Sequence, residues 1–127
     1  MSELPTDLRY TKDHEWVRPT GDAWAVGITH FAVEQLGDIT LVDLPREGDM
    51  ITKGQRFGTI ESVKSVSDLY APLSGKVVKV NDGLRDQPEL INSDCYAGAW
   101  MIEVAPSDKG DIDDLMDSGA YATHIAG

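Results

Sequence analysis

The chain has 127 residues, of which 41% are hydrophobic, and 22 acidic against 11 basic residues leave a net charge of −11. This length and composition favour one folded domain, residues 1–127, whose core needs neither disulfides nor a metal. A protein this acidic repels phosphate backbones and anionic lipid surfaces, so we expect neither nucleic acid nor a membrane as partner.

The residues that usually mark an enzyme are missing from the sequence. The single cysteine, Cys95, excludes an internal disulfide and a cysteine-based metal site. His14, His30 and His124 stand apart, without metal-binding spacing, and no nucleophile-elbow, dinucleotide or P-loop motif occurs. The start of the chain has no apolar signal core, and no apolar run is long enough to span a membrane. We therefore expect a cytoplasmic protein without catalytic apparatus of its own.

The N-terminal part of the chain predicts a hairpin followed by a short helix. Residues 14–18 and 22–28 carry aromatic and β-branched side chains on both sides of a Pro-Thr-Gly turn, which is typical of two paired strands. Residues 29–37 space their apolar side chains at helical distance. Thr29 is the expected N-cap of this helix, and Gly37 is expected to end it.

The middle of the chain is rich in predicted strands. Residues 38–45 predict a strand that ends at a proline, and residues 50–80 alternate short strand-like runs with turns. This spacing leaves no room for a βαβ crossover. Residues 81–98 are turn-rich and predict mostly loop with a helical turn near Pro88, and residues 100–105 predict the last strand.

The last 22 residues, 106–127, predict one or two helices. Ser107 and Ser118 are the expected N-caps. The apolar side chains that would anchor these helices are Ile112, Leu115, Met116, Tyr121 and Ile125. The chain is therefore expected to be mainly β, with helices at its periphery.

Residues 59–72 predict a second hairpin with a lysine at its tip. Lys64 and Ser65 are expected to form a two-residue loop. The residues then expected to lie opposite each other are Val63 and Val66, Ser62 and Ser67, Glu61 and Asp68, and Ile60 and Leu69. Two-residue loops favour Asn or Gly because their turns need positive φ angles, yet the sequence has neither there.

The lysine at this tip is expected to project into water. A buried ammonium group needs a polar partner, which the two flanking valines do not supply. Glu61 opposite Asp68 would destabilise the strand pair slightly. Position alone favours an ordinary solvated lysine, one of six in the chain. The identity of the residues around Lys64 decides between these interpretations.

The segment ESVKSVSD, residues 61–68, resembles the lipoyl-lysine hairpin of the glycine cleavage system H-protein family. Further blocks resemble the same family in order and spacing: YTKDHEWVR (10–18), VGIT (26–29), EQLGDI (34–39), VDLP (42–45), ELIN (89–92) and GAWMI (98–102). The resemblance covers residues 8–125. It implies a barrel-sandwich hybrid of the biotinyl/lipoyl-carrier type, mainly β, with short peripheral helices and a C-terminal helical segment.

The resemblance also implies which residues serve the cofactor. Lys64 would carry lipoate in amide linkage, within an attachment segment that includes Glu61, Ser62, Val63, Ser65, Val66 and Asp68. Glu15 and Asp68 match the family's polar cleft, where the loaded arm and its amine are shielded from water. One departure is His30, which stands where the family commonly has an aspartate in the first turn of a helix.

The partners that the resemblance implies are three enzymes and a lipoate-attaching enzyme. The P-protein, a pyridoxal-phosphate decarboxylase, loads an aminomethyl group onto the arm. The T-protein transfers the methylene group to tetrahydrofolate, and the L-protein, a flavin dehydrogenase, reoxidises the arm. We expect the carrier to be a monomer and not an enzyme itself.

Three other interpretations remain at this point. A lipoyl domain of a 2-oxoacid dehydrogenase complex is shorter and usually has an acidic residue before its lysine, where this chain has Val63. A biotin carrier typically flanks its lysine with methionines, where this chain has Val63 and Ser65. An H-like protein that hands lipoyl groups to other proteins would look the same in sequence.

Overall fold

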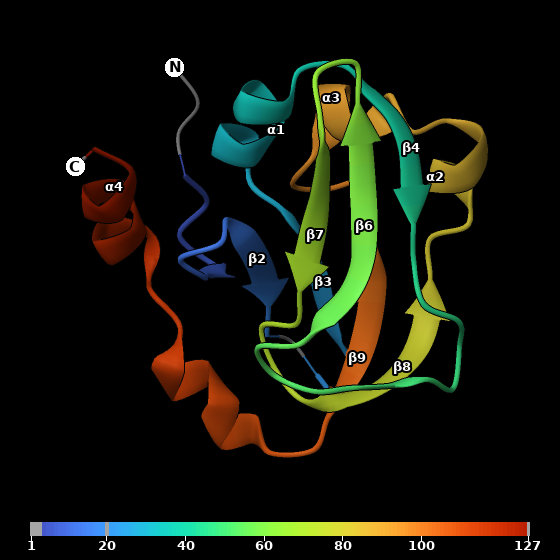
Figure 1. The fold of residues 1–127 in the computed structure, drawn as a ribbon. Coiled ribbons are helices and arrows are strands. Elements are labelled where there is room, and N and C mark those ends of the chain that lie inside the picture. The colour runs from blue at the N-terminus through green and yellow to red at the C-terminus, as the bar shows by residue number, and fades with distance from the viewer. Residues whose placement is uncertain (1–3, 20, 127) are drawn as a thin grey trace.

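The computed structural model describes residues 4–19 and 21–126 and arranges them as two antiparallel β-sheets with short helices around them (Figure 1). The larger sheet has six strands, in spatial order β1 (Arg9–Tyr10), β2 (Glu15–Arg18), β3 (Trp24–Ile28), β9 (Ile102–Pro106), β8 (Gly75–Val80) and β5 (Met50–Ile51). The smaller sheet has three, in the order β4 (Ile39–Asp43), β6 (Arg56–Ser62) and β7 (Val66–Tyr70). The expected architecture, with strands central and helices peripheral, is the one observed.

The main core lies between the two sheets. Ile60 and Leu69 project into it from the smaller sheet, with 1% and 2% of their surfaces exposed, as expected for the residues that anchor the lysine hairpin. Val77 and Val104 face them from the larger sheet and are fully buried. Each fully buried aliphatic side chain of this kind contributes about 1.5–3 kcal/mol, so these residues anchor the hairpin strands firmly to the body of the protein.

A second core lies outside the two-sheet sandwich, under the C-terminal helix α4 (Ser118–Ala126). Tyr10, Trp16 and Tyr121 are fully buried there, and the rings of Tyr10 and Tyr121 stack with their centroids 4.7 Å apart and a 9° angle between planes. Met116 and Ile125 pack against this cluster. The C-terminal helix is therefore attached mainly to the N-terminal strands, as Figure 1 shows at the left of the molecule.

Helix α1 (His30–Leu36) has the ends that the sequence predicts. Thr29 is its N-cap, and the Thr29 hydroxyl accepts a hydrogen bond from the backbone N–H of Ala32. At the other end Gly37 has φ +81° and donates its N–H to the carbonyl of Val33. With ψ −150° this conformation lies outside the left-handed helical region, and it is one that glycine adopts and other residues almost never do.

The C-terminal third differs from expectation in its helices. Two short helices, α2 (Gly83–Asp86) and α3 (Leu90–Asp94), occupy half of the predicted loop. They have four and five residues, too few to leave a periodic apolar pattern in the sequence. A 3₁₀ helix η1 (Lys109–Asp114) then precedes α4. No helix in the described ranges is long and apolar enough to cross a membrane.

Both predicted serine caps are wrong, each by one residue. The cap before Gly110 is Asp108, whose Oδ1 accepts from the Gly110 N–H at 2.8 Å. The cap of α4 is Asp117, whose Oδ1 accepts from the Ala120 N–H at 2.8 Å. Ser107 still belongs to the edge of the sheet, where its N–H donates to the carbonyl of Ser74, and the helix begins only after Asp108.

A close approach between β2 and β3 gives the first prediction. Gly27 lies opposite Trp16, and a Cβ on Gly27 would lie 2.6 Å from the Trp16 ring. Trp16 is fully buried, and its indole N–H donates to the carbonyl of Cys95 at 2.9 Å, so the ring has little room to move. Gly27→Ala is therefore expected to lower the free energy of unfolding, measured by urea denaturation, by about 1–3 kcal/mol.

Gly119→Ala is the matched control. A Cβ there would lie 3.6 Å from the nearest atom, and the position is exposed on α4, where alanine is the better helix former. This variant should be as stable as wild type or slightly more stable. A Gly27→Ala protein of undiminished stability would show that the Trp16 ring is not confined as described.

Candidate functional site: the hairpin tip and the cleft beside it

The lysine hairpin of β6 and β7 has a different register from the predicted one. Glu61 lies opposite Val66 and not opposite Asp68, which pairs with Thr59. The two central residues of the loop are Val63 and Lys64, closed by a backbone hydrogen bond of 2.8 Å from the Ser62 N–H to the Ser65 carbonyl. The expected repulsion between Glu61 and Asp68 as opposed residues is therefore wrong.

The hydroxyl of Ser62 explains how this turn forms without Asn or Gly. Ser62 Oγ accepts hydrogen bonds from the N–H groups of Lys64 and Ser65, each at 3.2 Å. Such side-chain acceptors replace backbone turn geometry and remove the need for a positive φ angle. Among the described residues other than glycine, only His14 has a positive φ. The predicted register is wrong because it rests on the turn preferences of glycine and asparagine and leaves out the Ser62 hydroxyl as a hydrogen-bond acceptor.

The tip is tied to the rest of the protein by a short chain of hydrogen bonds. The Val63 N–H donates to the Asp38 carbonyl at 3.0 Å. Next to it, Asn92 of α3 accepts from the Ile39 N–H and donates to the Gly37 carbonyl, both at 2.9 Å. Asn92 lies in the ELIN block, but only the structure shows that it secures the base on which the tip rests.

The Lys64 side chain is exposed and passes directly over Gly37. A Cβ on Gly37 would lie 3.2 Å from Lys64 Cε and 3.8 Å from Nζ, so a side chain here would crowd the lysine. Within the described ranges Nζ takes part in no hydrogen bond or salt bridge. The amine is therefore free to react or to carry a group.

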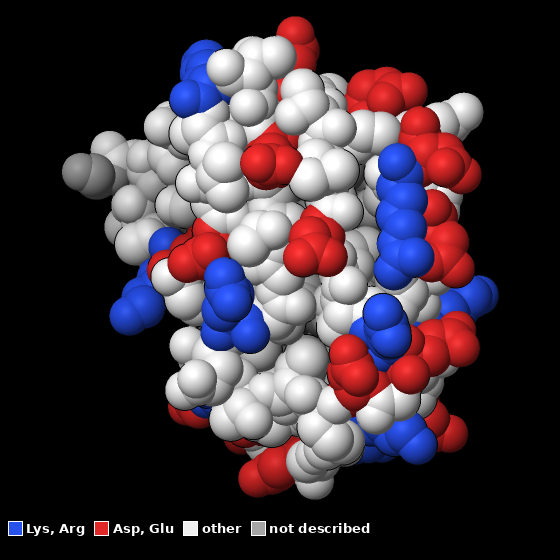
Figure 2. All heavy atoms as spheres, turned by 45° about the vertical axis from the view of Figure 1, so that its right-hand side comes forward, with Lys and Arg blue, Asp and Glu red and all other residues white. Residues whose placement is uncertain are grey.

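The outer face of the hairpin combines apolar side chains with a carboxylate. Leu41, Glu61 and Val66 lie in one row across β4, β6 and β7. Leu41, Val66 and the tip residue Val63 expose 50%, 63% and 69% of their surfaces. Figure 2, which turns the right-hand side of Figure 1 forward, shows a largely uncharged upper area interrupted by isolated acidic side chains. This combination suits contact with another protein.

A small cleft of about 140 Å³ lies between α1 and the hairpin. Glu15 and Asp68 both line it, so the structure brings the two predicted carboxylates to one place. Leu36 also lines it, and Leu36 precedes the glycine over which the Lys64 side chain passes. A flexible group attached to Lys64 would therefore start beside the mouth of this cleft.

Glu15 is the unusual member of the cleft because it is 99% buried. Thr11 donates its hydroxyl hydrogen to Glu15 Oε1 at 2.7 Å, and the Tyr70 N–H donates to Oε2 at 3.3 Å. No salt bridge in the described part of the chain reaches Glu15. Burial raises its pKa to about 8, against the lowering effect of the two hydrogen bonds. Near neutral pH the carboxyl group is thus largely protonated.

The neighbours of Glu15 include residues that the sequence analysis did not select. Thr11 forms the turn before β2, and its hydroxyl also accepts from the Asp13 and Glu15 N–H groups. His14 lines the cleft and contacts Tyr121 of α4. The block YTKDHEWVR contains Thr11 and His14, but no pattern in the sequence links them to a tyrosine more than a hundred residues away.

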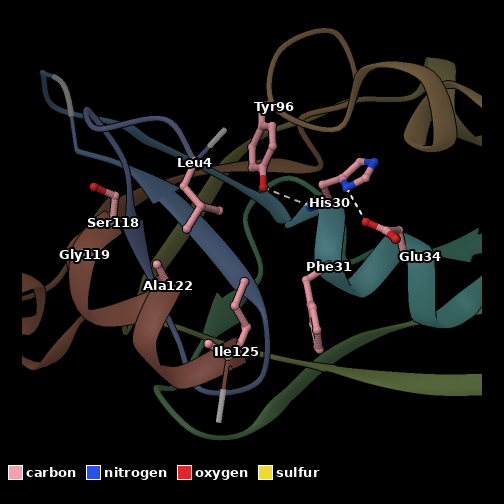
Figure 3. Close-up of a pocket in the computed structure, with 10 residues that line it drawn as sticks. Leu4, His30, Phe31, Glu34, Tyr96, Ser118, Gly119, Ala122 and Ile125 are labelled. Atoms are coloured by element: carbon pink, nitrogen blue, oxygen red, sulfur yellow. Dashed lines mark hydrogen bonds and ion pairs between the residues drawn. The ribbon is translucent and has the colours of Figure 1, made fainter. Parts of the chain in front are cut away.

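A second, larger pocket of about 690 Å³ lies between α1 and α4 (Figure 3). Phe31, Ala122 and Ile125 make most of its wall apolar. His30 stands at its rim, with Nδ1 2.8 Å from Glu34 Oε1. None of the predicted site residues lines this pocket, so it is separate from the lysine hairpin and its cleft.

A mainly β sandwich that presents an exposed lysine on a tethered hairpin defines the class of biotinyl and lipoyl carrier folds. The family profile described as glycine cleavage H-protein matches residues 8–126. The chain belongs to this family. The resemblance found in the sequence and the barrel-sandwich prediction are therefore confirmed.

Relatives and a solved structure agree with this assignment. The glycine cleavage system H protein of Anaeromyxobacter sp. (strain K) is 54% identical over 97% of this chain and 96% of its own. The glycine cleavage system H protein of Myxococcus xanthus is 52% identical over 93% of this chain and 92% of its own. The crystal structure of a glycine cleavage system H protein from Mycobacterium marinum, 38% identical, covers 98% of this chain and 100% of its own with a TM-score of 0.90.

The buried carboxyl group of Glu15 gives the second prediction. Its pKa is higher in the folded protein than in the unfolded chain, so the folded state binds more protons at intermediate pH. The stability that this proton contributes is complete below about pH 4.5 and is lost as pH rises to about 8. We expect urea denaturation to show a loss on the order of 2–4 kcal/mol across this window.

Glu15→Gln separates this effect from other titrations. The amide cannot ionise, so the curve of stability against pH should be flatter for the variant, which should exceed wild type above pH 8. His14 acts in the opposite direction, because burial lowers its pKa and stability is then lost as pH falls below about 6.5. Parallel curves for wild type and Glu15→Gln between pH 6.5 and 8 would contradict the prediction.

Proposed function

We propose that this member of the glycine cleavage H-protein family carries lipoate in amide linkage on Lys64 and serves as the carrier of the glycine cleavage system. The observation that carries this proposal is the free, exposed amine of Lys64 on a turn whose backbone is tethered on both sides. When bound, the dithiolane of lipoate supplies the reversible sulfur chemistry that holds the aminomethyl group and takes up electrons. The chain itself supplies the position from which that arm moves.

The tip fits covalent attachment of a carboxylic acid. Forming the amide requires access to Nζ, and no internal partner has to be displaced from it. The hydrogen bonds that the loop N–H groups donate to Ser62 Oγ and to the Asp38 carbonyl hold the loop backbone in place, so the attaching enzyme meets a preformed turn. Preformed recognition elements bind with less loss of conformational entropy.

The cleft beside the tip fits the storage of a loaded arm. The Asp68 side chain attracts an ammonium group, and a bound ammonium group in turn favours the ionised form of Glu15. The apolar walls from Leu36 and Ile60 exclude water. These residues bind and shield, and the chemical steps belong to the partner enzymes. We infer a single-domain, monomeric, non-catalytic carrier that works in the cytoplasm.

The partners follow from this role. The P-protein loads the aminomethyl group of glycine, the T-protein removes it, and the L-protein accepts the electrons. A lipoate-attaching enzyme must first recognise the hairpin. The outer face of the hairpin offers a contact surface beside Lys64. It consists of the apolar side chains of Leu41, Val63 and Val66 together with the carboxylate of Glu61.

Lipoylation of Lys64 is the third prediction. Intact-mass analysis of protein made in a host that supplies lipoate and its ligase should show one added lipoyl group. Lys64→Arg keeps the positive charge but presents no amine that can be acylated, so this variant should show none. Its free energy of unfolding should stay within about ±0.5 kcal/mol of wild type, because the side chain is exposed and unpaired.

Lys76→Arg is the matched control, since Lys76 is an exposed lysine on β8, away from the tip. It should be lipoylated as wild type is, and it should support glycine decarboxylation with the reconstituted P-, T- and L-proteins. The Lys64→Arg protein should not. Absence of the lipoyl mass from wild type under these conditions, or its presence in Lys64→Arg, would refute the assignment.

Recognition through Glu61 is the fourth prediction. Glu61 lies between the exposed apolar side chains of Leu41 and Val66, next to the residue that closes the loop. A partner that covers the tip must therefore contact its carboxylate. Glu61→Gln should lower kcat/KM for lipoylation severalfold while leaving stability unchanged, because charges at the edge of an interface act mainly on association.

Glu47→Gln is the matched control, because it removes the same charge away from the tip. Glu47 lies in the turn that follows β4, and the end of β4 next to this turn is the one farther from the tip. It should leave the lipoylation rate unchanged and so exclude an effect of net charge alone. Equal lipoylation kinetics for Glu61→Gln and Glu47→Gln would show that Glu61 plays no part in recognition.

A further inference from the structure

A buried tyrosine hydroxyl connects the C-terminal helix to the cleft. Tyr121 of α4 is fully buried. Its hydroxyl oxygen lies 2.8 Å from His14 Nδ1 and 2.7 Å from Thr29 Oγ1. His14 belongs to the turn before β2, and Thr29 is the N-cap of α1. One atom thus joins three segments that are far apart in the sequence.

His14 needs such support because its backbone is in an unfavourable conformation. Its φ angle is +72°, in the left-handed region that residues other than glycine seldom occupy. The backbone holds it there with two hydrogen bonds, from the His14 N–H to the Thr11 carbonyl at 3.1 Å and from the Thr29 N–H to the His14 carbonyl at 3.0 Å. The bond to Tyr121 fixes the side chain. Strained residues of this kind persist only where several contacts determine them together.

The residue after His14 is Glu15, which begins β2 opposite Ile28 of β3, so the conformation of His14 sets the direction in which the chain enters this strand. Thr11 holds the carboxyl group of Glu15 from the other side, through its hydroxyl hydrogen bond to Oε1. We propose that Tyr121 is a positioning residue of the cleft, which acts through His14 to hold the Glu15 carboxyl group in its buried place. The C-terminal helix would then be part of the cargo site although none of its residues lines the cleft.

The surroundings of α4 explain why a hydroxyl group has this effect. Figure 3 shows α4 and α1 facing each other across the larger pocket, so packing between them is open on that side. The Tyr121 ring is held by its stack on Tyr10, which belongs to β1 and has no contact with the cleft. The hydrogen bonds of Tyr121 to His14 and Thr29 therefore link α4 to the cleft, and His124 of the same helix adds a contact of its Nε2 with the Lys12 carbonyl at 3.2 Å.

Two tyrosines stacked on each other provide a matched test. Tyr121→Phe removes the hydroxyl group that contacts His14 and Thr29. Tyr10→Phe removes a hydroxyl group that donates to the Pro5 carbonyl at 2.6 Å. Both side chains are fully buried and each variant loses buried hydrogen bonding, so a drop in melting temperature is expected for both and does not discriminate.

The discriminating measurement is the titration of Glu15, followed by carboxyl carbon NMR in protein without lipoate. With the Tyr121 hydroxyl gone, His14 can relax and water can reach the carboxyl group, so Tyr121→Phe should weaken proton binding by Glu15 about tenfold. Tyr10→Phe should leave this titration unchanged. An unchanged titration in Tyr121→Phe, or equal changes in both variants, would overturn the proposal.

His14→Asn gives an independent second variant. Asparagine tolerates the left-handed conformation, but its shorter side chain loses the contact with Tyr121. The Glu15 titration should shift in the same direction as in Tyr121→Phe. The double variant should shift no further than the larger single effect, because both changes break one link. Additive shifts would mean that Tyr121 and His14 act separately and would overturn the proposal.

This inference rests on the proposed function only for its biological meaning, namely that Glu15 receives the loaded arm. Glu15→Gln tests that part separately in lipoylated, loaded protein, where the aminomethyl group should be lost faster than from wild type. Equal lifetimes would refute the cleft as a storage site. The NMR result on protein without lipoate would still decide whether Tyr121 positions Glu15.

Discussion

The hydroxyl group of Ser62 is the interaction on which the lysine site depends. By accepting from the N–H groups of Lys64 and Ser65, it closes the loop without a residue at positive φ. The tip can then hold Val63 and Lys64 rather than glycine or asparagine. The Val63 N–H is left to bind the Asp38 carbonyl, which ties the loop to the body of the protein. A rigid turn that presents a mobile side chain is the requirement for a carrier arm.

Helix α1 connects the two parts of the site because each of its ends has a separate task. Its last turn leads into Gly37, which leaves room for the Lys64 side chain. Its N-cap, Thr29, shares the Tyr121 hydroxyl with His14 and also donates its N–H directly to the His14 carbonyl, in the segment that carries Glu15. The start of this short helix is thus bonded to the segment of Glu15, and its end lies under the Lys64 side chain.

The sequence predicted those features that local patterns determine. Alternation and turn residues located the strands, and Thr29 and Gly37 marked the ends of α1. The errors arose where two local solutions compete. A serine hydroxyl shifted the hairpin register, and aspartates next to Ser107 and Ser118 took over as caps. The contacts of Asn92 and Tyr121 could not be predicted, because each joins segments that come together only in the folded chain.

The burial of Glu15 shows how function and stability oppose each other in this fold. An ionised carboxylate without a cationic partner is costly to bury, and the protein avoids that cost by keeping the group protonated near neutral pH. The protonated Glu15 stabilises the folded protein when the cleft is empty, and this contribution to the free energy of unfolding decreases as pH rises. A cation that enters the cleft reverses the balance, because it favours the ionised form of the same carboxyl group. Under the proposed function, the residue that weakens the empty protein at high pH is the one that would hold a tethered amine.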